Sequence, residues 1–340
     1  MHSESKADTG GAPTRAAERP NPLLGIGHWL VRTQEGILLI IVVALVLTLS
    51  YTSPVFMTQR NIGVLLSQIS MTAIAAFGMT ALVISGEVDL SIGSLQAFVG
   101  VLTMQVLNQY HNLALGILVG LGAALLVGLI NAGLTLRLHI SSFVVTLAMI
   151  SILRGMAYIS TNAAVQNAHK LPSFKALGNG FIGPIPVPVA IMVTIFIVFY
   201  LVLNRTTLGR YVYVTGGNQR AAVLAGVRVN TVKTLCFVLT SVLAALSAII
   251  LISRMNSGQN NAGVGFEMQV VGAVLLGGTS LAGGQGSIIG TLLAVLLLGT
   301  LNNGIILLGI NSSWQMASNG MLIILAVWLD ARRRRAMGEG

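Results

Sequence analysis

Long apolar runs recur along the sequence and are separated by short polar segments that often contain glycine, proline or arginine. A helix that crosses a membrane needs about 20 predominantly apolar residues, and most of the runs have roughly that length. The pattern therefore predicts an all-α membrane protein, a polytopic bundle of about ten transmembrane helices. The expected spans cover residues 36–51, 62–85, 92–107, 114–135, 142–159, 187–203, 233–252, 267–278, 286–308 and 314–329.

The eighth expected span, 267–278, is shorter than the others and ends at the pair Gly277 and Gly278. This predicts either a helix that crosses half of the membrane or a tilted helix that is broken at the glycines. Interrupted helices in transporters usually line the solute pathway. The short segment is therefore expected to matter for function.

The composition excludes an ordinary soluble domain. Hydrophobic residues make up 54% of the 340 residues and charged residues only 8%, whereas soluble domains carry about 25% charged residues. A soluble chain with so little charge would expose apolar surface and aggregate. Lipid is therefore the solvent for most of this chain.

The positive charges predict how the chain is oriented. If the N-terminus is cytoplasmic and the sides alternate, 14 of the 19 Lys and Arg residues face the cytoplasm, in agreement with the positive-inside rule. An even number of spans also places both termini, which are both basic, in the cytoplasm. Because the net charge of +10 lies between the apolar runs and at the termini, the chain is not expected to bind nucleic acid.

The chain divides into one membrane domain and two tails. Residues 1–35 are polar and predict a disordered cytoplasmic tail, residues 36–329 form a single transmembrane domain, and residues 330–340 form a basic cytoplasmic tail. Two connections are long, an outer loop at 160–186 and an inner loop at 204–232. The other connections are short, which indicates one helical unit.

Two inner turns resemble each other. Residues 86–94 and residues 277–287 are both glycine-rich polar turns between apolar spans. Many transporters contain structural repeats, and this short match suggests one here.

The motifs of catalysis and energy conversion are missing from the sequence. The five histidines lack the spacing of a metal pair, and there is neither a nucleophile motif nor a phosphate-binding P-loop. The chain is therefore not expected to be an enzyme or to bind a metal or a cofactor. Nearly every span also lacks Asp, Glu and Lys, the groups that usually couple transport to ions. Two alternatives remain, an ATP-independent solute channel and a pore that another subunit operates.

The inner loop 204–232 favours the second alternative. Asn218 is a good N-cap, residues 219–225 favour a helix, and Gly226 suits a helix stop. A short helix with small residues on one face is able to dock in a groove of another protein. The same pattern also allows a helix that lies on the lipid surface.

Four segments together resemble the ribose-type sugar permeases of bacterial ABC importers. They are residues 86–94 (GEVDLSIGS), 209–226 (GRYVYVTGGNQRAAVLAG), 277–290 (GGTSLAGGQGSIIG) and 301–309 (LNNGIILLG). The resemblance covers roughly residues 35–330, with the motifs in the same order and spacing. It implies a multi-pass permease of the bacterial inner membrane that forms the path for a small sugar or polyol.

The resemblance also implies partners. It implies a second permease copy, identical or similar, a cytoplasmic ABC ATPase that holds ATP and Mg, and a periplasmic sugar-binding protein. The loop between the sixth and seventh spans is then the segment that couples the permease to the ATPase. The matching residues in this sequence are Gly216, Gly217, Asn218, Ala221, Ala222 and Gly226.

Three positions depart from the pattern of the family. Glu87 stands where relatives usually have glycine, Val88 where they usually have isoleucine, and Gln269 where many carry an acidic residue. Glu87 itself is expected to be a solvated loop charge. The departures leave the particular sugar open.

Four polar residues are candidates for the pathway or a gate. Asp89 either caps the helix that follows it or takes part in gating or in a contact between subunits. Arg154, inside a span, either extends toward the membrane surface or faces the pathway. Asn302 and Asn303 either form a polar contact between helices or line the pathway.

Overall fold

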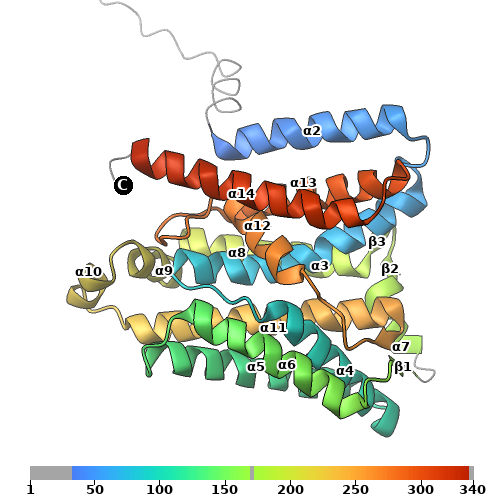
Figure 1. Cartoon of the computed structure of the whole chain (residues 1–340), viewed down its shortest axis with the longest axis horizontal. Helices are drawn as coiled ribbons and strands as arrows, with labels where there is room; N and C mark the ends of the chain where they lie inside the picture. Colours follow the sequence, from blue (N-terminus) through green and yellow to red (C-terminus); the bar gives the residue numbers. More distant parts are fainter. Residues whose placement is uncertain (1–32, 169–171, 337–340) are drawn as a thin grey trace, which may run out of the picture.

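The computed structural model describes residues 33–168 and 172–336, and its long helices lie side by side in one bundle (Figure 1). The predicted tail at 1–35 lies outside the described residues except for its last three, where Thr33 caps a helix that begins at Gln34. The helices are α2 (Gln34–Thr52), α3 (Gln59–Ile84), α4 (Ile92–Tyr110), α5 (Leu113–Leu136), α6 (Ser142–Thr161), α7 (Pro172–Asn179), α8 (Val187–Arg205), α9 (Thr207–Gly217), α10 (Gln219–Leu224), α11 (Val229–Met255), α12 (Phe266–Leu276), α13 (Ile288–Leu307) and α14 (Ser313–Ala336). Four two-residue strands complete the described chain, β1 (Gln166–Asn167), β2 (Phe181–Ile182), β3 (Ile185–Pro186) and β4 (Ser257–Gly258).

Seven of the described helices are long and apolar enough to cross a membrane, namely α2, α3, α5, α6, α8, α11 and α13. The prediction of a polytopic all-α membrane protein is therefore confirmed. Of the other three expected spans, α4 and α14 are long but carry amides such as Gln105 and Gln315, which lower their hydropathy. The third is α12.

The eighth expected span, at 267–278, corresponds to α12, an apolar helix of 11 residues. At 1.5 Å per residue it is about 16 Å long, roughly half of a hydrocarbon core of about 30 Å. It ends where the glycine pair begins, with Gly277 as its C-cap.

Helices α3 and α11 form the centre of the bundle. Their most apolar stretches are 72% and 67% buried, against 17% for α2 and α8, which present apolar side chains outward. Small residues allow the two central helices to approach closely, because a Cβ at Gly78 would lie 2.8 Å from the Cα of Thr240. In Figure 1, α5, α6 and α4 lie on one side of this centre and α13, α14 and α2 on the other.

The expected outer loop at 160–186 contains a helix and three of the short strands. β1 pairs with β4 in antiparallel register, and α7 packs on α11 through the fully buried side chain of Phe174. Gly178 N donates to Ser253 Oγ at 2.8 Å, and that hydroxyl donates to the carbonyl oxygen of Phe174. These local contacts were not apparent from the hydropathy pattern.

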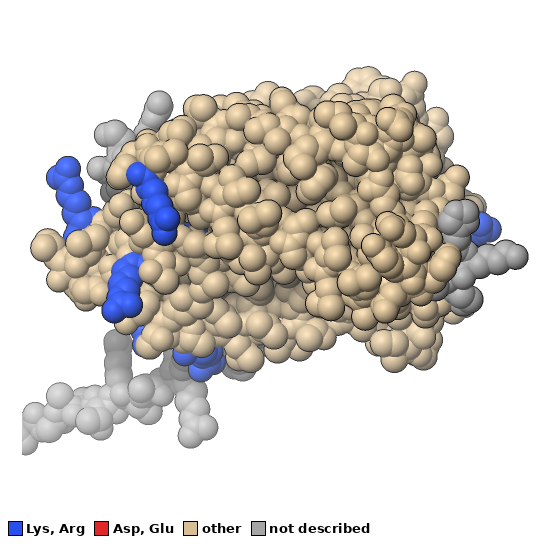
Figure 2. Space-filling model, turned by 90° about the horizontal axis from the view of Figure 1, so that it is seen from below, with Lys and Arg blue, Asp and Glu red and all other residues tan. Residues whose placement is uncertain are grey.

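Both ends of the described chain lie at the same end of the bundle as α10 (Figure 1). Gln34 Nε2 donates to the carbonyl oxygen of Leu276 at 2.9 Å, while α14 returns to this end and continues to Ala336, into the segment predicted to be a tail. Figure 2 shows Lys and Arg side chains gathered mostly at one end of the molecule, with an uncharged band over the middle of that face. An uncharged belt with basic residues at its border is typical of a membrane protein.

The two glycine-rich turns share a local structure. Helices α3 and α12 both end in a glycine with positive φ, Gly86 at 88° and Gly278 at 91°. In each case this glycine and the following residue donate their N–H groups to carbonyls of the last turn, the pattern of a Schellman motif. The turns also touch, since Gly284 N donates to Ile84 O at 2.8 Å.

Candidate functional site

A cavity of about 280 Å³ lies among the central helices. Five amide side chains converge on it from different elements, and the described residues that line it are all uncharged. They are Gln68, Ile69, Met71 and Thr72 of α3, Gln96 of α4, Leu251 of α11, Phe266 and Gln269 of α12, Val295, Gly299, Asn302 and Ile306 of α13, and Gln315 of α14.

The lining suits a polar, uncharged ligand. An amide both donates and accepts hydrogen bonds, and the side chains of Gln68 and Gln269 make no hydrogen bond to other described residues. The buried Oδ1 of Asn302 also lacks a partner within the described chain. Buried polar atoms usually have partners, so these amides are free for a ligand that carries hydroxyl groups.

The structure separates the two neighbouring asparagines of α13. Asn302 lines the cavity. Asn303 is buried on another side of the helix, where it exchanges two amide hydrogen bonds with Asn61 of α3 at 3.0 and 3.1 Å. Asn303 thus makes a polar contact between helices, the first of the two predicted roles of these asparagines. Asn302 lies in the cavity wall, where the second predicted role, lining a pathway, would place it.

Arg154 does not line the cavity, and its side chain is half-buried. Its Nη1 donates to the carbonyl oxygens of Asn260 and Ala262 at 2.8 and 2.7 Å. These carbonyls belong to the segment that leads into α12, whose first residue Phe266 lines the cavity. Arg154 therefore positions the segment that enters α12. Its two predicted orientations, toward the membrane surface or toward the pathway, stay predictions.

Asp89 is fully buried in the α3–α4 turn. Its Oδ1 accepts hydrogen bonds from Ser91 N at 2.8 Å and Ser91 Oγ at 2.5 Å, and its Oδ2 accepts one from Asn131 Nδ2 at 3.3 Å. Burial raises the pKa of the Asp89 carboxyl, and the hydrogen bonds from Ser91 and Asn131 oppose that rise in part. These contacts fix the turn ahead of α4 and attach it to α5.

The inner loop folds into two helices, α9 and α10, of which only the second was expected. Asn218 caps α10 as predicted, since its side chain accepts a hydrogen bond from Ala221 N at 2.9 Å. Gly226 has a φ of 80° and ends the helix with a further Schellman motif. Gly216 and Gly217 belong to the last turn of α9.

Of the two alanines of α10 that the sequence singled out, Ala221 is exposed and Ala222 is buried. Ala222 is 0% exposed, so its methyl group packs inside the chain. Val223 and Leu224 are 57% and 89% exposed, and these two side chains form the apolar tip of α10. The helix α10 itself lies at one end of the molecule (Figure 1). The signal that would have found them is two aliphatic residues in a helix too short to bury them.

Gly216 lies at a close junction of three segments. A Cβ on Gly216 would lie 1.8 Å from Ile84 O and 2.6 Å from Gly284 N. Nearby, the hydroxyl of Tyr213 donates to Gly286 O at 3.0 Å. The end of α9 therefore contacts both glycine-rich turns.

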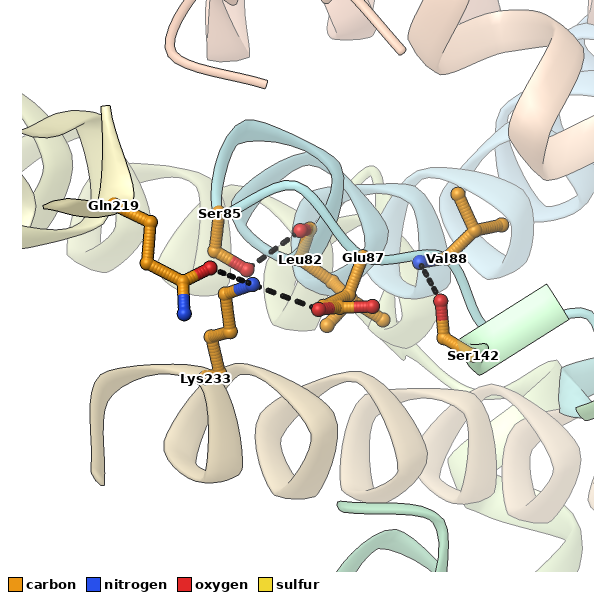
Figure 3. Close-up of polar contacts among 7 residues, drawn as sticks. All are labelled: Leu82, Ser85, Glu87, Val88, Ser142, Gln219 and Lys233. Carbon is orange, nitrogen blue, oxygen red and sulfur yellow. Dashed lines mark hydrogen bonds and ion pairs between the residues drawn. The ribbon is translucent and has the colours of Figure 1, made fainter. Parts of the chain in front are cut away.

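A buried ion pair adds a fourth segment to this junction. Lys233 Nζ of α11 lies 2.7 Å from Glu87 Oε1 and 3.3 Å from Gln219 Oε1 (Figure 3). The side chains of Lys233 and Glu87 are only 8% and 13% exposed, so the expectation that Glu87 is a solvated loop charge is wrong. Lys233 thus connects the first residue of α10 to the α3–α4 turn.

Comparison with known proteins identifies the type of chain. The family model described as branched-chain amino acid transport system / permease component matches residues 61–327. No solved structure matches the chain.

Several permeases are similar to this chain over most of its length. The ribose import permease protein RbsC of Escherichia coli K12 is 37% identical over 309 residues, which cover 90% of this chain and 95% of the relative. The protein of the same name in Bacillus subtilis 168 is 37% identical over 290 residues, covering 85% and 90% of the two chains. The L-arabinose ABC transporter permease protein AraH of Azospirillum brasilense is 37% identical over 308 residues, covering 91% and 90%.

Proposed function

Because the chain belongs to the family of branched-chain amino acid transport system permease components, we propose that it is the membrane-spanning permease subunit of an ABC importer for a small sugar or polyol. The observation that carries this proposal is the uncharged, amide-lined cavity. A sugar offers hydroxyl groups that pair with amides. A branched-chain amino acid would bring two charged groups and an apolar side chain into the same cavity, and burying unpaired charges is costly.

The membrane arrangement follows from this proposal. Ten segments cross or enter the bilayer of the bacterial inner membrane, the seven long apolar helices together with α4, α12 and α14. The α10 end, with both ends of the described chain, faces the cytoplasm. The basic side chains at that end support this orientation (Figure 2).

The permease works with partners in this proposal. A periplasmic binding protein delivers the solute, a second permease copy completes the membrane unit, and a cytoplasmic ATPase supplies the energy from ATP and Mg. The names of relatives such as the arabinose ABC transporter permease support this assignment. The alternative is an ATP-independent solute channel, which would bring the solute only to equal concentrations.

An uptake experiment tests the function and the cavity together. Cells of the source organism from which the gene has been deleted should lose concentrative uptake of labelled D-ribose or L-arabinose but keep uptake of L-leucine. Return of the wild-type gene should restore the uptake of the pentose. Asn302→Leu should restore about 5- to 150-fold less uptake, because leaving a hydrogen-bonding group of the buried solute unpaired costs about 1–3 kcal/mol. The transport rate per folded molecule is the measurement.

Asn303→Leu is the matched control. It breaks the pair with Asn61, so it should lower the amount of folded permease but leave uptake per folded molecule nearly unchanged. Loss of leucine uptake with intact pentose uptake would contradict the sugar assignment. Pentose uptake that only equilibrates, and that persists after ATP is depleted, would identify a channel.

A second prediction concerns coupling through the tip of α10. Leu224→Asp should abolish co-purification of the ATPase, or leave ATP hydrolysis without transport, because it places a charge where an apolar contact is proposed. Folding should be unaffected, since Leu224 is 89% exposed. Met57→Asp, an exposed apolar residue in the α2–α3 turn at the opposite end, should retain the ATPase. Normal ATPase capture and normal uptake by Leu224→Asp would favour the interpretation in which α10 lies on lipid.

A further inference from the structure

A second hollow of about 600 Å³ lies away from the amide-lined cavity, between α5 and α11 near the α10 end. It is a groove whose walls come from the last turns of α5 and the first turns of α11. The lining residues are Leu129, Ala132, Gly133, Leu136 and Arg137 of α5 and its C-cap, and Asn230, Thr231, Thr234, Leu235 and Val238 of α11. The residues that line this groove and those that line the amide-lined cavity are different.

The lining changes from polar to apolar along both helices in the same direction. On α11 the side chains run from Asn230 and Thr231, through Leu235, to Val238, at spacings of three and four residues that share one helix face. α5 runs in the opposite direction along the chain and ends in this region with Arg137. Each wall is therefore polar toward the α10 end and apolar toward the middle of the membrane.

The polar end continues into a neighbouring pocket of about 380 Å³. Leu136 and Asn230 line both hollows. The Arg, Lys and Glu residues that line the two hollows are the exposed Arg137, together with Lys233 and Glu87, whose charges compensate each other. His139 also lines the second pocket. The uncompensated charge is thus positive, which favours an anionic group.

The apolar part of the groove is open. A Cβ on Gly133 would meet nothing within 4 Å, so the backbone of α5 forms a floor that no side chain covers. Leu129 and Leu235 beside it are 43% and 36% exposed. The side chains of Thr231 and Thr234 make no hydrogen bond within the described chain, which leaves two hydroxyls for a ligand.

We propose that this groove binds one anionic phospholipid from the surrounding bilayer. The phosphodiester lies at Arg137, Asn230 and Thr231, and an acyl chain runs over Gly133 toward Val238. A phospholipid matches each feature in order, with an anionic head at the basic, polar end and a hydrocarbon tail along the apolar floor. That the lipid belongs to the cytoplasmic leaflet rests on the orientation proposed above; the site itself does not.

The test measures retained lipid, not transport, so it is independent of the proposed function. Full-length wild-type chain and variants are purified from nanodiscs that contain equal amounts of phosphatidylglycerol and phosphatidylcholine, and bound lipid is counted by native mass spectrometry. Wild type should retain phosphatidylglycerol at least about fivefold over phosphatidylcholine, as expected for one additional charge contact near a membrane surface. Gly133→Leu should lose the tightly bound lipid because the new side chain fills the groove.

Two matched controls separate the site from general effects. Gly122→Leu changes another glycine of α5 with open space around it and should retain lipid as wild type does. Arg137→Gln should bring the ratio of the two lipids close to one, while Arg205→Gln, an exposed arginine outside the groove, should leave it unchanged.

Two results would overturn the proposal. The first is equal retention of both lipids by wild type, which would mean ordinary annular lipid only. The second is unchanged phosphatidylglycerol retention in Gly133→Leu together with a loss of dimer, which would assign the groove to contact with a second copy of the chain. If Gly133→Leu reduced the yield of folded protein, the comparison of Arg137→Gln with Arg205→Gln would decide the question, because both residues are exposed.

Discussion

Gly216→Ala should strongly lower the stability of the folded chain, whereas Gly217→Ala should be tolerated. A Cβ on Gly216 would lie 1.8 Å from Ile84 O and 2.6 Å from Gly284 N. Both are backbone atoms, which cannot rotate away, and they are hydrogen-bonded to each other at 2.8 Å. Overpacking typically costs about 1–3 kcal/mol, and a clash that also separates a backbone hydrogen bond should reach or exceed the upper figure.

Gly217 provides the control because it is the next residue of the same helix turn. Its added Cβ would meet the Cα of Gly284 at 3.7 Å, an ordinary contact. The yield of monodisperse protein after detergent extraction, together with its thermal midpoint, is the measurement. Equal yields and midpoints for the two variants would show that the junction is looser than the structure describes.

The ion pair between Lys233 and Glu87 should give the second large effect. Lys233→Ala leaves the buried carboxylate of Glu87 without its partner at 2.7 Å. Removing one member of a buried pair costs about 3–5 kcal/mol, and the remaining exposure of 8% and 13% places the expected loss near the lower end. Glu87→Gln should cost less, because a neutral amide still accepts a hydrogen bond from the ammonium group.

A double-mutant cycle separates the pair from its surroundings. The charge reversal Glu87→Lys with Lys233→Glu, and the neutral pair Glu87→Gln with Lys233→Met, should each recover much of the stability that Lys233→Ala loses. Thermal unfolding of the purified variants in one detergent is the measurement. Strictly additive single effects would show that the two side chains do not stabilise each other.

The membrane spans could be predicted from the sequence because a bilayer imposes one simple requirement on length and polarity. The short α12 could be predicted for the same reason, since its glycine pair is visible in the sequence. Asn218 and Gly226 could be placed at the two ends of α10 because caps are local signals.

The cavity could not be predicted in this way. Its amides come one or two at a time from separate helices, and a single Gln68 or Gln315 in an apolar run has no local feature that marks it. The pairing of Lys233 with Glu87 joins residues that are 146 positions apart. Asn302 and Asn303 are adjacent in sequence but point in directions about 100° apart on the helix, and only the packing of α13 decides which one faces the cavity.

The position of helix α3 determines how movement can pass from one end of the molecule to the cavity. The helix carries Gln68 and Thr72 at the cavity and ends at Ile84, beside the junction with α9 and α10. Between Thr72 and Ile84 the helix is continuous, contains no proline and is fully buried, over about 18 Å. A continuous, well-packed helix of this kind moves largely as one rigid element. Under the proposed function, α3 is therefore the element that would carry a movement from the α9–α10 junction to the cavity, and a proline introduced at Ala76 should interrupt it by breaking the helix.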